Sequence, residues 1–103
     1  MTDAFTSVAC LSDLPPDTPT RVEAGGHALL LCRVGDQVFA IAEHCSHADQ
    51  SLETGRIRNN WIACPAHGAR FDLETGDAMG PPATAPIRTY PVRIVGDTIE
   101  VSV

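Results

Sequence analysis

Hydrophobic and polar residues alternate most regularly at the C-terminal end of the sequence. In "VRIVGDTIEVSV" (residues 92–103), branched apolar residues occupy every second position on both sides of Gly96-Asp97. A period of two is typical of a strand with one buried face, and a Gly-Asp pair between two such runs indicates a tight turn. The segment therefore predicts an antiparallel hairpin with one buried and one solvent-exposed face.

A second hairpin is predicted by "HALLLCRVGDQVFAIA" (residues 27–42), where two apolar runs flank Gly35-Asp36. The longest uninterrupted apolar run, Ala28–Cys32, is far too short to cross a membrane. No stretch shows sustained helical spacing, and turn residues separate many short candidate strands. We therefore expect an all-β chain built as an antiparallel sandwich or barrel.

The pattern changes between the two hairpins. Residues 43–87 contain three of the four histidines, two of the four cysteines and four of the eight prolines. Within this segment, "TGDAMGPPATAP" (residues 75–86) has too many helix and strand breakers for regular structure and predicts a loop stiffened by its prolines. We expect one domain, residues 1–103, with a loop-rich subdomain at about 43–87.

Length and charge narrow the functional classes. The chain has 103 residues, enough for one modest core, and its seven basic and thirteen acidic residues give a formal net charge of −6. Nucleic acid is a poor partner for such a chain, because binding phosphates requires a cationic surface, whereas a basic protein patch is a suitable one. The N-terminus "MTDAFTSV" has no basic or apolar leader pattern, so we expect a cytoplasmic protein with no membrane segment.

In a reducing compartment, cysteines are metal ligands or buried thiols more often than disulfides. Cys10 and Cys32 are interpreted as buried small hydrophobic residues, and Trp61 and Tyr90 as packing residues. The other two cysteines lie beside histidines. Cys45-x-His47 is followed, after sixteen residues, by Cys64-x-x-His67.

Two thiolates and two neutral imidazoles exclude calcium and magnesium and leave zinc or an iron–sulfur cluster. Zinc fingers usually take a cysteine pair from one element and a histidine pair from another. Here each loop supplies one residue of each type, so the cysteines can meet on one metal and the histidines on a second. That division suits a two-iron cluster with chemically different ends, and zinc stays open as the alternative.

These motifs resemble those of Rieske [2Fe–2S] proteins, specifically the Rieske-type ferredoxins of bacterial aromatic-ring dioxygenase systems. "CSHADQSLETG" fits the first loop of that family, "CPAHGARFDLETG" the second and "GPPATAPIRTYPV" its proline loop, in the order of the family. The resemblance implies an antiparallel β-sandwich with a cluster-binding subdomain and one [2Fe–2S] cluster. It implies that Cys45 and Cys64 bind the buried iron, and that His47 and His67 bind the outer one.

The resemblance also implies a function. Such a ferredoxin is a soluble one-electron carrier, not an enzyme, between an NAD(P)H-dependent flavoprotein reductase and a terminal ring-hydroxylating oxygenase. The docking surface is then the cluster tip, ringed by small or weakly polar residues: Ser46, Ala48, Ala66, Gly68 and Pro81. Two alternatives belong to other classes, a structural zinc module and a Rieske-like small subunit of a nitrite reductase-type enzyme; absorption and EPR spectra distinguish zinc from the cluster.

The expected redox potential follows from residues that are missing. Respiratory-type Rieske proteins carry an extra cysteine in each loop, which form a disulfide, and a serine and a tyrosine that donate hydrogen bonds to the cluster. This chain has Gln50, Ala66, Ala69 and Phe71 at those positions. Fewer donors stabilise the reduced state less, so we expect a midpoint near the low end of the Rieske range, roughly −150 mV.

Overall fold

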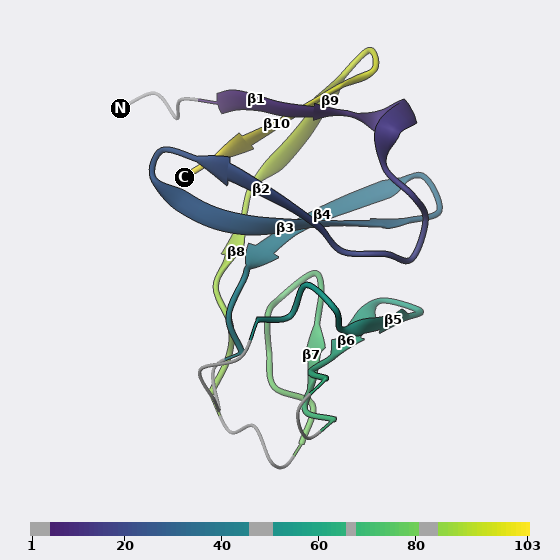
Figure 1. The fold of residues 1–103 in the computed structure, drawn as a ribbon, viewed down its shortest axis with the longest axis vertical. Helices are drawn as coiled ribbons and strands as arrows, with labels where there is room; N and C mark the ends of the chain where they lie inside the picture. The colour runs from purple at the N-terminus through teal and green to yellow at the C-terminus, as the bar shows by residue number, and fades with distance from the viewer. Residues whose placement is uncertain (1–4, 46–50, 66–67, 81–84) are drawn as a thin grey trace.

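The computed structural model describes residues 5–45, 51–65, 68–80 and 85–103, and that part of the chain is all-β. It contains a short 3₁₀ turn, η1 (Leu11–Asp13), and strands that Figure 1 labels in chain order. The strands are β1 (Phe5–Cys10), β2 (Thr20–Ala24), β3 (His27–Val34), β4 (Gln37–Ala42), β5 (Arg56–Arg58), β6 (Trp61–Ala63), β7 (Arg70–Asp72), β8 (Thr89–Tyr90), β9 (Val92–Val95) and β10 (Thr98–Ser102). The all-β expectation is confirmed.

Both predicted hairpins are present. β3 and β4 pair antiparallel around Gly35-Asp36, and β9 and β10 pair antiparallel around Gly96-Asp97. Gly35 and Gly96 have positive φ angles of 61° and 64°, a conformation that costs little only for glycine. The turn chemistry therefore fixes the register of each hairpin, as the alternating pattern predicts.

The strands form three sheets, and all strand pairs within them are antiparallel. The strand orders are β1-β10-β9, β2-β3-β4-β8 and β5-β6-β7. The first two sheets pack face to face around a core that includes Leu29, Leu31, Ile99 and Val101. This pair is the expected sandwich, and the β5-β6-β7 sheet lies at the opposite end of the molecule from β1 and β10 (Figure 1).

A second core lies on the other face of the β2-β3-β4-β8 sheet. There Leu30, Cys32 and Ile41 pack with buried residues of the segment between β4 and β8, among them Ile62 and Phe71. Successive residues of β3 therefore enter different cores, and Leu29, Leu30, Leu31 and Cys32 all have no exposed surface. A strand buried on both faces requires a continuous apolar run, which explains Ala28–Cys32.

Two expectations about burial need correction. Cys10, interpreted as a buried small residue, is exposed at the end of β1, whereas Cys32 is fully buried. Ile94 is on the same face as buried Ile99, which it opposes, yet it keeps 38% of its surface exposed. β9 is the outer strand of its sheet, so its apolar positions are covered on one side only. Among the described residues, no helix is long and apolar enough to span a bilayer.

Candidate metal centre

The first predicted ligand, Cys45, lies three residues after the end of β4 and packs in the second core. Its side chain is 5% exposed and belongs to the same buried cluster as Leu52 and Phe71. An isolated bridge between His44 and Ser51 closes the two ends of the first loop. The loop that begins at Cys45 is therefore held at its base by backbone pairing.

Glu43 reinforces this closure from two directions. Its backbone carbonyl accepts the N–H of Leu52 at 2.7 Å, and its Oε2 accepts the hydroxyl of Ser51 at 3.1 Å. Arg21 on β2 places its Nε 3.3 Å from the same Oε2, and the Glu43 side chain is only 12% exposed. A largely buried, paired carboxylate fixes the loop base more strongly than an exposed ion pair does. The sequence analysis did not single out Glu43.

The second predicted ligand, Cys64, lies just after β6 in the turn that leads to β7. The Cys64 N–H donates to the Ala69 carbonyl at 2.6 Å, and the Gly68 N–H donates to the Cys64 carbonyl at 2.9 Å. Gly68 has a φ of 74°, and a Cβ placed there meets no atom within 4 Å. The glycine is therefore required by its backbone conformation and not by crowding.

The segment that precedes the proline loop folds back along β7. The Met79 N–H donates to the Arg70 carbonyl at 2.8 Å, and Ala78 forms an isolated bridge with Phe71. Asp72 caps the turn, since its Oδ1 accepts the backbone N–H groups of Glu74 at 2.8 Å and Thr75 at 3.1 Å. The described part of residues 75–86 contains neither strand nor helix, as expected, and this pairing brings Met79 to β7.

Several predicted residues lie outside the described part of the chain. They are the ligands His47 and His67, the tip residues Ser46, Ala48, Ala66 and Pro81, and Gln50. The two described ligands, Cys45 and Cys64, belong to one buried cluster with Ala69 and Phe71.

The remaining cysteines do not compete for this position. No disulfide joins the four cysteines, all of which lie in described residues. Cys10 is exposed on β1, and burial raises the pKa of the Cys32 thiol to about 12. Cys32 lies inside β3, opposite Phe39 of β4, and in neither of the two loops. Two buried cysteines that begin neighbouring loops, rather than lying inside a strand, fit the sulfur end of a Cys₂His₂ two-iron site.

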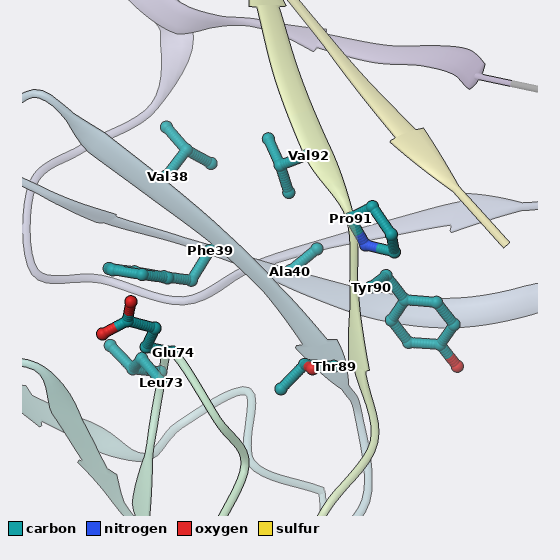
Figure 2. Close-up of a pocket in the computed structure, with 9 residues that line it drawn as sticks. All are labelled: Val38, Phe39, Ala40, Leu73, Glu74, Thr89, Tyr90, Pro91 and Val92. Atoms are coloured by element: carbon teal, nitrogen blue, oxygen red, sulfur yellow. The ribbon is translucent and has the colours of Figure 1, made fainter. Parts of the chain in front are cut away.

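A pocket of about 480 Å³ lies elsewhere, between the sandwich and the turn after β7. Figure 2 shows Phe39 of β4 facing Leu73 and Glu74, with Thr89, Tyr90 and Pro91 along another side. Neither of the two described ligand candidates, Cys45 and Cys64, lines it.

Residues 4–91 match the family described as the Rieske [2Fe–2S] domain. The chain belongs to the Rieske [2Fe–2S] family. Its cofactor is therefore one Rieske [2Fe–2S] cluster, and zinc is not needed to explain the two Cys/His pairs.

The matches to known Rieske ferredoxins extend over nearly the whole chain. The ferredoxin component of biphenyl 2,3-dioxygenase from Rhodococcus jostii (strain RHA1) is 38% identical over 93% of this chain and 90% of its own length. The ferredoxin of carbazole 1,9a-dioxygenase from Nocardioides aromaticivorans IC177 is 37% identical, with a TM-score of 0.91 over 95% of this chain and 96% of that one. A ferredoxin solved in complex with the oxygenase of carbazole 1,9a-dioxygenase is 32% identical, with a TM-score of 0.89 over 98% of this chain and 94% of that one. These matches confirm the Rieske fold and the ferredoxin class expected from the motifs.

Proposed function

We propose that Cys45, His47, Cys64 and His67 hold the Rieske cluster, with the thiolates on the inner iron and the imidazoles on the outer one. The burial of Cys45 and Cys64 in one core supports the inner position of the thiolates. In Rieske centres both histidines bind the same iron, and here each histidine follows its cysteine by two or three residues, so each loop offers one ligand to each iron. Residues of about 43–87 are then the cluster-binding unit of the single domain.

When bound, the cluster accepts and returns one electron. The chain's own residues supply its surroundings. Phe71, with no exposed surface, and Ala69, also fully buried, exclude water from the side of Cys64. The bond from the Cys64 N–H to Ala69 holds the second loop closed, and the contacts of Glu43 do the same for the first. A rigid site keeps the geometry change on electron uptake small.

The protein is accordingly a one-electron carrier of a ring-hydroxylating dioxygenase system. Its closely similar relatives are ferredoxin components, and one such ferredoxin has been solved bound to its oxygenase. We propose that this chain takes electrons from an NAD(P)H-dependent flavoprotein reductase and gives them to a terminal oxygenase. The tip around His47 and His67 is the proposed exit for the electron. Met79 is 42% exposed next to the proline loop, and we propose it as an apolar contact of the same docking surface.

The proposed midpoint potential is low, roughly −150 mV within a Rieske range of about −150 to +300 mV. Ala69 and Phe71 support it, because neither side chain can donate a hydrogen bond to a cluster sulfur.

The main support for the ligand assignment is the joint burial of Cys45 and Cys64, whose loops each contain a histidine. The test compares Cys64→Ser with Cys10→Ser, the same substitution at an exposed cysteine. After anaerobic reconstitution, we expect Cys10→Ser to keep the red-brown absorption and electron transfer from a flavoprotein reductase to an oxygenase. We expect Cys64→Ser to lose both. A Cys64→Ser protein that retains the wild-type spectrum would contradict the ligand assignment.

A further inference from the structure

The outer face of the β5-β6-β7 sheet carries side chains that the proposed function leaves unexplained. Along these strands Ile57, Ile62 and Phe71 point into the second core and are at most 6% exposed. Because successive strand residues point to opposite faces, their neighbours share the other face. We call four of them the arginine face: Arg56 and Arg58 of β5, Trp61 of β6 and Arg70 of β7.

Strand register brings these four residues together. Arg58 lies directly opposite Trp61, and the guanidinium carbon of Arg70 lies 5.4 Å from the centroid of the Trp61 ring. Ala63 is the partner of both Arg56 and Arg70, so only a small side chain separates these two arginines. Trp61 is half-buried and the three arginines are exposed. The result is a cationic surface around a rigid aromatic ring.

None of the three arginines forms an ion pair among the residues that the structure describes. The one acidic residue on this face, Asp72, lies opposite Trp61 and uses Oδ1 to accept two backbone N–H groups. Arg21 and Arg93 on the sandwich, in contrast, are paired with glutamates. The arginine face is therefore available to an external anion.

The positive charge of the arginine face contrasts with the negative charge of the rest of the chain. Residues 56–72 contain three arginines and one aspartate, a formal charge of +2, while the remaining residues contain four arginines and twelve acidic residues, a formal charge of −8. A local cationic patch on an acidic protein orients the molecule during encounter, because the rest of the surface repels an acidic partner. Arg and Trp are also enriched in interface centres relative to other surfaces.

We propose that the arginine face docks an acidic surface of the flavoprotein reductase that loads this carrier. The proposal rests on the carrier function proposed above. A carrier that has taken up one electron is one unit more negative, so its attraction to an acidic partner falls and its attraction to a basic partner rises. An acidic docking surface therefore favours release of the loaded carrier. The reductase must release the carrier after loading it, so an acidic docking surface suits the reductase. The oxygenase must instead bind the loaded carrier, so an acidic docking surface suits it less.

The test measures binding of purified, oxidised holoprotein to two probes. One is a flavoprotein reductase chosen because it reduces the wild-type chain, and the other is the terminal oxygenase of carbazole 1,9a-dioxygenase from Nocardioides aromaticivorans IC177. Arg56→Gln/Arg58→Gln removes two charges from the arginine face. Arg88→Gln/Arg93→Gln removes two exposed charges outside the β5-β6-β7 sheet and is the matched control for net charge. Arg56→Lys/Arg58→Lys keeps the charge, and thermal unfolding and cluster absorption verify that each variant is intact.

We expect Arg56→Gln/Arg58→Gln to weaken reductase binding about tenfold, with a shallower dependence on salt, because two exposed charge pairs are lost. The control and the lysine variant should stay within about threefold of wild type, and oxygenase binding should not change. Unchanged reductase affinity, an equal loss in the control, or a loss confined to the oxygenase would each overturn the proposal. Failure of the proposed carrier function is distinguishable from failure of the docking proposal. It would appear in the wild type itself, as an absent cluster or as no electron uptake.

Discussion

Ala69 shows how a single side chain sets the properties of the proposed cluster. Its carbonyl accepts the Cys64 N–H, so its backbone is fixed next to a proposed ligand, while its methyl group is fully buried and offers no donor. Ala63 precedes Cys64 directly, but lies on the outer face of β6 and is partly exposed. Two alanines close to the same ligand in the chain therefore have different access to it.

Ala69→Ser should raise the midpoint potential by about 40 mV, because one added hydrogen bond stabilises the reduced cluster by about 1 kcal/mol. A redox titration followed by visible absorption measures the shift. Ala63→Ser is the control and should leave the potential within about 10 mV of wild type, since its hydroxyl lies on the outer face. An Ala69→Ser midpoint equal to or below that of the wild type would contradict this account of the low potential.

The four candidate ligands could be proposed from the sequence because their motifs are local. One cysteine and one histidine within three or four residues define each loop whatever the rest of the fold does. The roles of Glu43 and Trp61 could not be predicted from neighbouring residues in the sequence. The role of Glu43 depends on Arg21, which is distant in the chain, and Trp61, expected to be a packing residue, is half-buried beside an arginine from another strand. Such contacts exist only once the sheets have formed.

At the scale of elements, β3 is the strand that joins the sandwich to the candidate metal centre. Leu31 packs in the sandwich core, and Leu30 packs in the core that contains Cys45 and Cys64. Both leucines have no exposed surface, so truncation of either leaves a cavity of similar size. The two positions differ only in the side of the sheet that the cavity faces.

Leu30→Ala and Leu31→Ala should each lower the free energy of unfolding by about 2–5 kcal/mol. Only Leu30→Ala should also accelerate loss of cluster absorption under native conditions, because its cavity lies in the core that contains the proposed ligands Cys45 and Cys64. Chemical unfolding measures the first effect, and the decay of visible absorption in the presence of an iron chelator measures the second. Equal decay rates in the two variants would show that the cores do not act separately.

Gly76 fixes the return of the chain from β7 toward β8. Its φ is 80°, and a Cβ there would lie 2.2 Å from the Ile87 carbonyl oxygen, whose residue donates its own N–H to the Gly76 carbonyl. Gly35 also has positive φ, but a Cβ there meets nothing within 4 Å. The first glycine is needed for both conformation and space, and the second for conformation alone.

Gly76→Ala should therefore destabilise the protein by about 3 kcal/mol or more, and Gly35→Ala by about 1 kcal/mol. Denaturant unfolding of the two variants against wild type gives the comparison. If the two substitutions cost the same, the close approach of Gly76 to Ile87 has no energetic weight.

The elements differ in how far the sequence predicts them. The hairpins β3-β4 and β9-β10 follow from alternation around a Gly-Asp turn, which involves neighbouring residues only. The pairing of β1 with β10 joins opposite ends of the chain, and no local pattern encodes it. Strands β5, β6 and β7 have three residues each, too few to show a period of two. Their sheet is stabilised by burial of one residue from each strand, which only the folded core reveals.

In the whole molecule, the sandwich and the candidate metal centre belong to separate hydrophobic cores. The sandwich provides one core and the loops with the β5-β6-β7 sheet provide another, and the chain as a whole has a radius of gyration of 12.9 Å, which is ordinary for about 100 residues. The terminal strands β1 and β10 lie at the end of the molecule remote from the β5-β6-β7 sheet (Figure 1). Charge is divided in the same way, with the cationic arginine face at the cluster end of an otherwise acidic molecule.

Pulsed EPR of the reduced protein, labelled with ¹⁵N-histidine, tests whether two cysteines and two histidines of this chain bind a single [2Fe–2S] cluster. We predict hyperfine coupling to two histidine nitrogens that persists in His27→Ala and His44→Ala, with one coupling lost in each of His47→Cys and His67→Cys. A reduced protein whose signal shows no coupling to histidine nitrogen, or whose couplings survive both cysteine substitutions, would contradict the account.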